Sequence, residues 1–350
     1  MRAVERLRGR LDGLGAASFL VTDPINVRYV TGFESTNAAA IVRADRILLL
    51  TDGRYLAAAR GVNGVEVVDA GRDLAVFLGE RLAELAEAPV AVEADHLTYA
   101  AYGSVASGGA ELVPTTRVVK ELRAIKTAAE LDAVRRAASV NHDALVRIST
   151  EQFVGRTEAE VAWTVEQAIH EAGADELAFP VIVASGRNAA VPHHHPGGRR
   201  IEAGETVIVD AGAKVDGFCS DCTRTFATGD LPADLEAAYA LCQAVQGEAL
   251  AAVRAGAVAR EVDAIARSRV SAAGDDVLHG LGHGVGLFIH ELPVLSDLSE
   301  ETLSAGNVVT VEPGVYRSGI GGVRIEDLVV VTSDGPEVLT PFTKDLVRVE

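Results

Sequence analysis

The C-terminal two-thirds of the chain repeats one order of secondary-structure elements, and this duplication limits the folds open to it. Each half begins with two stretches of helical periodicity, at 127–149 and 157–172 in the first half and at 232–254 and 259–273 in the second. Strand-like segments with two acidic residues follow each helical pair: Asp210 and Asp221 in the first half, Glu312 and Glu326 in the second. Because each acidic pair is expected on a hairpin, the repeat predicts a duplicated domain whose two halves share one central site.

Two capping boxes mark where the first two helices begin. In Thr127-x-x-Glu130 and Thr157-x-x-Glu160, the Thr oxygen and the Glu carboxylate satisfy amide groups that the first helical turn leaves unpaired. Gly173 suits the C-terminal cap of the second helix. These signals predict helices that start at residues 127 and 157.

Five residues have the chemistry of metal ligands and lie at the edges of strand-like runs or in Gly-rich loops: Asp210, Asp221, His283, Glu312 and Glu326. An acidic residue after a strand is, taken singly, more often a turn or capping residue. Four carboxylates in one pocket would repel, since two unit charges about 4 Å apart cost roughly 4 kcal/mol at an effective dielectric of 20. Two divalent cations would cancel the four charges, and this donor set suits Mn²⁺ and its neighbours. The set therefore predicts a two-metal hydrolytic centre.

The five residues and their flanking segments resemble the pita-bread metallopeptidase family, which includes methionine aminopeptidases, aminopeptidase P and prolidase. The segments are VIVDAG (207–212), SDCTRTF (220–226), GLGHGVGLFIHELP (280–293), VTVEPGVY (309–316) and GGVRIEDLVV (321–330). The resemblance implies that Asp210 binds one metal ion, that His283 and Glu312 complete the second, and that Asp221 and Glu326 bridge both. It implies two divalent ions, most simply Mn²⁺ with Co²⁺ or Zn²⁺ as alternatives, and no other cofactor.

The first third of the chain alternates helical and strand-like stretches, which predicts an α/β domain. Its segments NVRYVTGF (26–33) and LLLTDGRYLAAA (48–59) resemble the N-terminal domain of prolidases and aminopeptidase P. We therefore expect an α/β domain of the creatinase/prolidase N-terminal type over residues 1–117. The resemblance implies that an α+β pita-bread catalytic domain with an internal pseudo-twofold follows over residues 118–350.

Three further residues are expected to take part in catalysis: His193, His290 and Arg324. The family resemblance implies that the two histidines bond the scissile carbonyl or the tetrahedral intermediate and help to move protons. Arg324 lies two residues before Glu326 and is expected to orient that carboxylate, with Thr223 as a second donor; both could instead be structural.

Several neighbouring side chains leave alternatives open. Within the triple His193-His194-His195 the position after Pro192 matches the family pattern, so His194 and His195 are read as local variation. A separate metal-binding tract is the alternative. Glu291 is a weaker candidate than His290 for an acid or base.

Composition excludes some classes of function and suggests a compartment. A net charge of −18 argues against nonspecific nucleic-acid binding. No apolar run reaches the length of a membrane span, and the start of the chain lacks the features of a signal peptide. Three cysteines, an odd and low number, suit a reducing compartment, so we expect a cytoplasmic protein. The C-x-x-C pair at Cys219 and Cys222 is read as ordinary buried thiols.

Together these features predict a proline-specific metallo-exopeptidase that hydrolyses a Xaa-Pro bond next to a free N-terminus. Xaa-Pro dipeptidase and Xaa-Pro aminopeptidase activities both remain open. The preference leans to the aminopeptidase, although Arg199 and Arg200 could hold a dipeptide carboxylate. The alternatives are a methionine aminopeptidase, which generally lacks a domain like residues 1–115, and a non-catalytic peptide-binding module. The resemblance also implies a homodimer in which the N-terminal domain of one subunit approaches the groove of the other.

Overall fold

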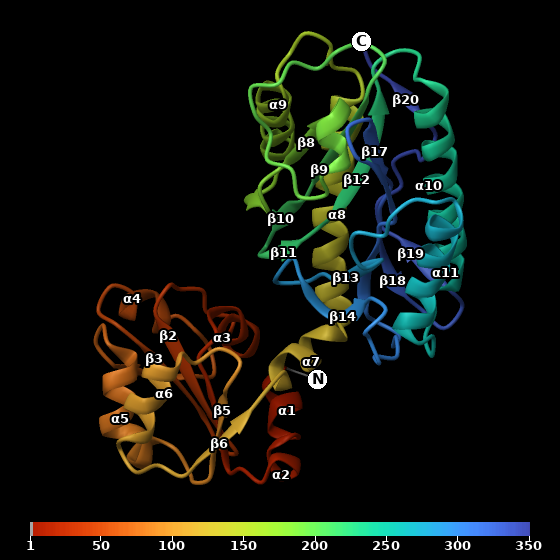
Figure 1. Cartoon of the computed structure of the whole chain (residues 1–350). Coiled ribbons are helices and arrows are strands. Elements are labelled where there is room, and N and C mark those ends of the chain that lie inside the picture. The colour runs from red at the N-terminus through yellow and green to blue at the C-terminus, as the bar shows by residue number, and fades with distance from the viewer. Residues whose placement is uncertain (1–2) are drawn as a thin grey trace. The chain divides into compact units, whose positions relative to one another are not determined.

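The computed structural model describes residues 3–350, which form two compact units. The first unit ends at Arg123 and the second runs from Ala124 to Glu350 (Figure 1). Helix α7 (Val118–Ala124) leads from one to the other along the chain. Within residues 3–350, no helix is both long and apolar enough to cross a lipid bilayer.

The N-terminal unit contains one six-stranded sheet in the order β4-β3-β2-β1-β5-β6. The strands are β1 (Ser18–Val21), β2 (Ala38–Arg43), β3 (Ile47–Thr51), β4 (Glu66–Asp69), β5 (Val90–Glu93) and β6 (Leu112–Thr115). Strand β2 pairs antiparallel with β1 and β3, whereas the outer pairs are parallel. The helices are α1 (Ala3–Arg8), α2 (Leu11–Leu14), α3 (Pro24–Thr31), α4 (Leu56–Ala59), α5 (Leu74–Leu85) and α6 (Tyr99–Ala106).

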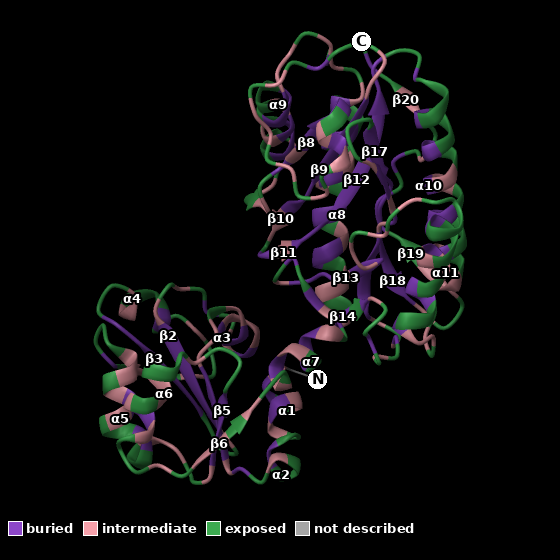
Figure 2. Cartoon of the chain, in the orientation of Figure 1, coloured by how far each residue is buried: buried purple, intermediate pink, exposed green. Residues whose placement is uncertain are grey.

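Both faces of this sheet are covered, which explains why its central strands read as continuous apolar runs. Phe19 of β1 packs with Leu7 of α1 in one cluster, and the next residue, Leu20, packs with Leu78 and Leu82 of α5 in another. Successive strand residues point to opposite faces, so β1, β2, β3 and β5 are almost wholly buried (Figure 2). The predicted α/β domain is confirmed.

Four long helices pack on the strands of the catalytic unit. They are α8 (Ala128–Ile148), α9 (Glu158–Glu171), α10 (Ala233–Ala252) and α11 (Ala259–Ala272), each within a few residues of its predicted range. Both predicted capping boxes form: Thr127 and Thr157 each accept a hydrogen bond from the residue three positions on, and Glu130 and Glu160 bond back. The caps of α10 and α11, Pro232 and Val258, make no side-chain hydrogen bond.

The strands of the catalytic unit form two larger sheets, one in each half. The first half has the order β20-β12-β9-β8, from β8 (Ile182–Ser185), β9 (Thr206–Ala211), β12 (Cys222–Ala227) and β20 (Val347–Arg348). The second has the order β14-β13-β15-β18-β19, from β13 (Gly282–Gly284), β14 (Glu291–Leu295), β15 (Val308–Val311), β18 (Asp327–Val331) and β19 (Pro336–Val338). Antiparallel β8-β9-β12 in the first half thus corresponds to β13-β15-β18 in the second.

Smaller elements complete the unit. They are β7 (Glu176–Leu177), β10 (Ala213–Val215), β11 (Phe218–Cys219), the 3₁₀ helix η1 (Gly186–Ala190) and the hairpin β16 (Gly314–Arg317) and β17 (Gly321–Arg324).

Each half has its own apolar core, and in both halves that core lies between two helices and the strands of one sheet. In the first, Leu145 of α8 and Val165 of α9 pack against Val209 of β9. In the second, residues of α10 and α11 pack against Val309 of β15 and Val329 of β18. Figure 1 shows α9 on one side of the strands and α10 with α11 on the other. This is the duplicated architecture that the repeat in the sequence predicts.

Candidate functional site

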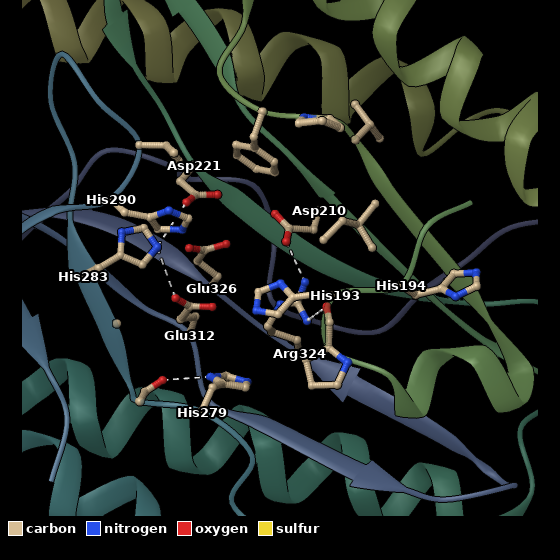
Figure 3. A pocket seen from close by; sticks show the side chains of 18 of the residues that line it. His193, His194, Asp210, Asp221, His279, His283, His290, Glu312, Arg324 and Glu326 are labelled. Carbon is tan, nitrogen blue, oxygen red and sulfur yellow. Dashed lines mark hydrogen bonds and ion pairs between the residues drawn. The ribbon is translucent and has the colours of Figure 1, made fainter. Parts of the chain in front are cut away.

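A cavity of about 420 Å³ opens in the catalytic unit (Figure 3). All the residues predicted as metal ligands or catalytic groups line it: His193, Asp210, Asp221, His283, His290, Glu312, Arg324 and Glu326. The rest of its wall includes apolar side chains, among them Phe179, Val181, Ile182, Ile289 and Val294. One concave site thus contains the ionisable groups that are spread over more than a hundred residues of sequence.

The four carboxylates occupy equivalent positions in the two halves. Asp210 lies near the end of β9, and Asp221 immediately precedes β12, the antiparallel partner of β9. In the second half Glu312 immediately follows β15, and Glu326 immediately precedes β18, the partner of β15. Each hairpin therefore places one acid at the end of a buried strand and a second at the start of the next.

Three of these acids form a tight buried cluster. Oxygen atoms of Asp210, Asp221 and Glu326 lie within 4.8 Å of one another. Asp210 Oδ1 and Glu326 Oε1 are buried and have no hydrogen-bond partner among the described residues. Buried oxygens without a partner are costly. Carboxylate oxygens are good ligands for hard divalent cations, which would supply the missing partner. The donor set therefore fits metal ions.

Burial and mutual repulsion make these carboxyl groups weak acids. Burial, followed by the charges of Glu312 and Asp210, raises the pKa of Glu326 well above its usual range. Burial and then Glu326 do the same for the pKa of Asp221. Burial raises the pKa of Glu312 to about 8, although Arg324 opposes the shift. Without cations the cluster retains protons, and cations would compete with those protons for the same oxygens.

His283 presents a neutral nitrogen to the acids. Its Nδ1–H donates to the Gly284 carbonyl at 3.1 Å, which leaves the Nε2 lone pair free. Nε2 lies 3.4 Å from Glu312 Oε1 and 3.6 Å from Asp221 Oδ2. Burial lowers the pKa of His283 to about 4, so the ring is uncharged at neutral pH and has the form that binds a metal.

Arg324 contacts a different acid from the one expected. Its Nη2 donates to Asp210 Oδ2 at 2.6 Å, and its Nε donates to Thr223 Oγ1 at 3.1 Å. Thr223 in turn donates to Glu326 Oε2 at 2.8 Å. The guanidinium therefore holds Asp210 directly and reaches Glu326 only through the Thr223 hydroxyl, because Arg324 ends a strand that packs against β9.

His193 and His290 lie at the more exposed side of the cavity. The His290 ring lies 4.5 Å from the His283 ring, measured between centroids. Burial and the neighbouring His193 lower the pKa of His290. Glu291, the weaker acid–base candidate, does not line the cavity; its carboxylate accepts a hydrogen bond from the Phe288 amide at 3.0 Å.

The sequence-based set misses His279, which also lines the cavity. Its Nδ1–H donates to the Gly280 carbonyl at 2.8 Å, and its Nε2 accepts from the Tyr316 hydroxyl at 2.8 Å. Tyr316 accepts from Arg324 Nη1 at 3.1 Å. Burial lowers the pKa of His279 to about 4. The one feature of the sequence that could indicate His279 as a site residue is its position directly before the Gly-rich segment that contains His283. That feature is weak, because a histidine before a glycine is equally compatible with an ordinary loop.

The comparisons with known proteins agree with this geometry. Residues 132–333 match the model of metallopeptidase family M24, and residues 4–125 match the creatinase/prolidase N-terminal domain. An uncharacterised peptidase of Bacillus subtilis is 36% identical over 349 residues, which cover 98% of this chain and 99% of that one.

Two solved structures are similar over nearly the whole chain. A Xaa-Pro dipeptidase from Bacillus anthracis has a TM-score of 0.93 and 36% identity, with 99% of both chains covered. An X-Pro aminopeptidase from Thermotoga maritima has a TM-score of 0.92 and 28% identity, again with 99% of both chains covered. The fold expected from the sequence is confirmed, and the chain belongs to metallopeptidase family M24, with a creatinase/prolidase N-terminal domain before the catalytic domain.

Proposed function

We propose that this protein is a metal-dependent exopeptidase that hydrolyses Xaa-Pro bonds next to a free N-terminus, with its catalytic machinery in residues 118–350. The observation that carries the proposal is that the two carboxylate pairs, the uncharged ring of His283 and the exposed histidines His193 and His290 all line one cavity of about 420 Å³. The similar structures from B. anthracis and T. maritima, named as a Xaa-Pro dipeptidase and an X-Pro aminopeptidase, support the choice of substrate.

Five side chains would hold two divalent ions: Asp210, Asp221, His283, Glu312 and Glu326. Oxygen donors with a single imidazole favour Mn²⁺, with Co²⁺ and Zn²⁺ as alternatives. When bound, the ions would lower the pKa of a water molecule and polarise the carbonyl of the scissile bond. Arg324 fixes the Asp210 carboxylate and, through Thr223, the Glu326 carboxylate.

His193 and His290 would act on the substrate. An uncharged His290 can donate a hydrogen bond from its N–H to the scissile carbonyl oxygen as negative charge develops there. The leaving nitrogen of proline carries no proton in the peptide, so it must receive one when the bond breaks. A histidine is suited to deliver it because its pKa lies near neutrality.

The surroundings of the cavity favour peptides longer than a dipeptide. A strict dipeptidase needs a cation for the free proline carboxylate. Arg199 donates to Ser185 Oγ at 2.7 Å and to Glu205 Oε2 at 2.9 Å, and Arg200 donates to the Gly155 carbonyl at 2.6 Å. Neither lines the cavity. Among the described residues that do, Arg324 is the sole Lys or Arg, and Asp210 neutralises it.

Steady-state assays of the full chain would test the proposal. The protein is stripped with a chelator, reloaded separately with Mn²⁺, Co²⁺ or Zn²⁺, and offered Ala-Pro, Ala-Pro-Ala and Met-Ala-Ser. We expect metal-dependent cleavage of Ala-Pro-Ala at a kcat/KM at least equal to that of Ala-Pro. A strong preference for Ala-Pro would overturn the lean to longer peptides. Cleavage of Met-Ala-Ser alone would favour a methionine aminopeptidase, and cleavage of none a peptide-binding module.

The assembly and the compartment are also proposals. The family resemblance supports a homodimer, which light scattering on a dilution series would test; a monomer mass with full activity would contradict it. A cytoplasmic location is consistent with Cys219, Cys222 and Cys242, which are buried and form no disulfide within residues 3–350.

A further inference from the structure

Glu158 is one of several buried acids of the catalytic unit that lie outside the cavity and outside the acidic cluster. Glu158, the first residue of α9, is wholly buried, and it is not among the residues that line the cavity. A buried carboxylate is costly unless hydrogen bonds and charges compensate it. Glu158 therefore occupies a position where an apolar residue would cost less, and its partners indicate what it does.

Those partners come from one stretch of the chain. Oε1 of Glu158 accepts hydrogen bonds from the Ser185 amide at 2.9 Å, the Ser185 hydroxyl at 2.8 Å and Asn188 Nδ2 at 3.0 Å. Oε2 accepts from His194 Nε2 at 2.8 Å and from the Gly197 amide at 3.4 Å. A single carboxylate thus ties both ends of the segment 185–197, which leaves β8 and returns to the start of α9.

The carboxylate stays ionised in this environment. Burial opposes the charge, but hydrogen bonds from His194, Ser185 and Asn188 outweigh it and hold the pKa of Glu158 below its usual range. The start of a helix adds a favourable dipole. An ionised acceptor makes stronger hydrogen bonds than a neutral one. Glu158 therefore holds the segment 185–197 in place at neutral pH.

The anchored segment carries His193. The two neighbouring histidines take different directions: His193 lies beside Asp210 and Arg324, and His194 lies away from the acidic cluster (Figure 3). On its other side the segment is held by Arg324, whose Nη1 donates to the Pro192 carbonyl at 3.2 Å. The backbone that carries His193 is therefore fixed between Pro192, bonded to the site, and His194, bonded to Glu158.

We propose that Glu158 is a positioning residue for His193, and that it acts through His194 and the segment 185–197. The inference rests on the proposed function, because that function gives His193 its task. In this arrangement the two neighbouring histidines have different roles. His193 faces the substrate, and His194 sets the position of His193 through its bond to Glu158. Small displacements of a reacting group are costly, since about 1 Å of misplacement lowers a rate by up to about 10²-fold.

The first experiment follows the segment itself and does not depend on turnover. Hydrogen–deuterium exchange is compared between the wild-type protein and Glu158→Gln, with Glu166→Gln on the same helix as the control. We expect faster exchange in residues 186–198 for Glu158→Gln only, with bound metal unchanged. Unaltered exchange in that segment would overturn the anchor, as would faster exchange spread over the whole unit.

The second experiment tests whether the anchor acts on His193. Glu158→Gln should lower kcat about 10- to 100-fold on the best Xaa-Pro substrate, with KM changed less than about twofold. In a His193→Ala background the same substitution should cost no further kcat, because the group that it positions is gone. His194→Gln, which keeps an N–H donor, should retain more activity than His194→Ala.

An equal loss of kcat from Glu158→Gln in both backgrounds would mean that the residue is merely structural, and the proposal would fail. A wild-type protein that cleaves no Xaa-Pro peptide would instead refute the proposed function. The two failures are distinguishable, because the exchange measurement reports on the anchor in either case.

Discussion

The two halves of the catalytic unit share their carboxylates and differ in almost everything else that lines the cavity. Asp210 and Asp221 in the first half match Glu312 and Glu326 in the second, strand for strand. The other ionisable groups are unequal: the second half adds His279, His283, His290 and Arg324 to the cavity, whereas the first adds the tandem that begins at His193. The duplication therefore accounts for a symmetric negative cluster, and the departures from it supply the groups that can distinguish one end of a substrate from the other.

Each half also has a buried carboxylate close in sequence or in space to an exposed histidine of the cavity. In the first half Glu158 bonds His194, the neighbour of His193. In the second, Glu291 follows His290, and its carboxylate lies 3.3 Å from Lys126 Nζ, with both side chains almost wholly buried. The chemistry of the two anchors differs, since one pairs with an imidazole and the other with an ammonium group. In both halves the buried carboxylate accepts hydrogen bonds from the loop that carries an exposed histidine of the cavity.

The largest expected effect is on the turnover and bound metal of variants in the carboxylates that the two halves share. Asp221→Asn and Glu326→Gln remove one acid from the equivalent position of each half, and both should lose nearly all turnover and bound metal. Metal analysis after dialysis, and turnover with added Mn²⁺, check this. If either variant kept full activity, the two halves would not contribute equally to one metal centre. If the metal-free wild-type protein were fully active, turnover would not depend on metal at all.

The next effect separates the groups that face the substrate from those that would hold metal. His193→Ala and His290→Ala should each lower kcat about 10²- to 10³-fold, the usual cost of losing a donor to a developing oxyanion, with metal content near that of the wild-type protein. His283→Ala should lower both quantities. A harmless His193→Ala beside a severe loss in His194→Ala would reverse the roles assigned within the tandem.

The parts of the fold that depend on neighbours in sequence could be predicted. The capping boxes at Thr127 and Thr157 placed the starts of α8 and α9, because the bonds in question join residues three apart. Repetition of the acidic pairs indicated one shared cavity. A capping box lies within four consecutive residues, and the acidic pair recurs in each half, so both patterns can be recognised without knowing which elements pack together.

The contacts that span the fold could not be predicted. The bond from Arg324 to Asp210 joins residues 114 positions apart, and sequence adjacency suggested Glu326 instead. The bond between His194 and Glu158 joins a loop to a helix start 36 positions away, so the residues around His194 do not indicate it. In both cases the packing of elements that are distant in sequence decides which partner a side chain meets.

A smaller effect concerns pH and metal together. Burial raises the folded-state pKa of Glu312 from 4.5 to about 8, and the pKa values of Asp221 and Glu326 also rise. A raised folded pKa gives stability that is present below the unfolded value and is lost as pH rises through the folded one. The melting temperature of the metal-free protein should therefore fall between about pH 5 and pH 8. Saturating metal should remove most of this slope; a metal-free protein that gains stability over that range would contradict it.

The smallest effect concerns two helix starts that differ by one hydroxyl group, that of α8 in the first half and that of α11 in the second. Thr127 caps α8 with its side chain, whereas Val258 caps α11 with none, although its backbone has the extended conformation of a cap and Glu261 stands three residues on, as Glu130 does after Thr127. Thr127→Val should cost about 1 kcal/mol, and Val258→Thr should gain up to about the same amount by completing a capping box. For a domain of this size that is a shift in melting temperature of about 2–4 °C in opposite directions, measurable by calorimetry, with kcat unchanged because neither residue lines the cavity. Shifts of the same sign would mean that packing around the two side chains, rather than the cap hydroxyl, distinguishes these two helix starts.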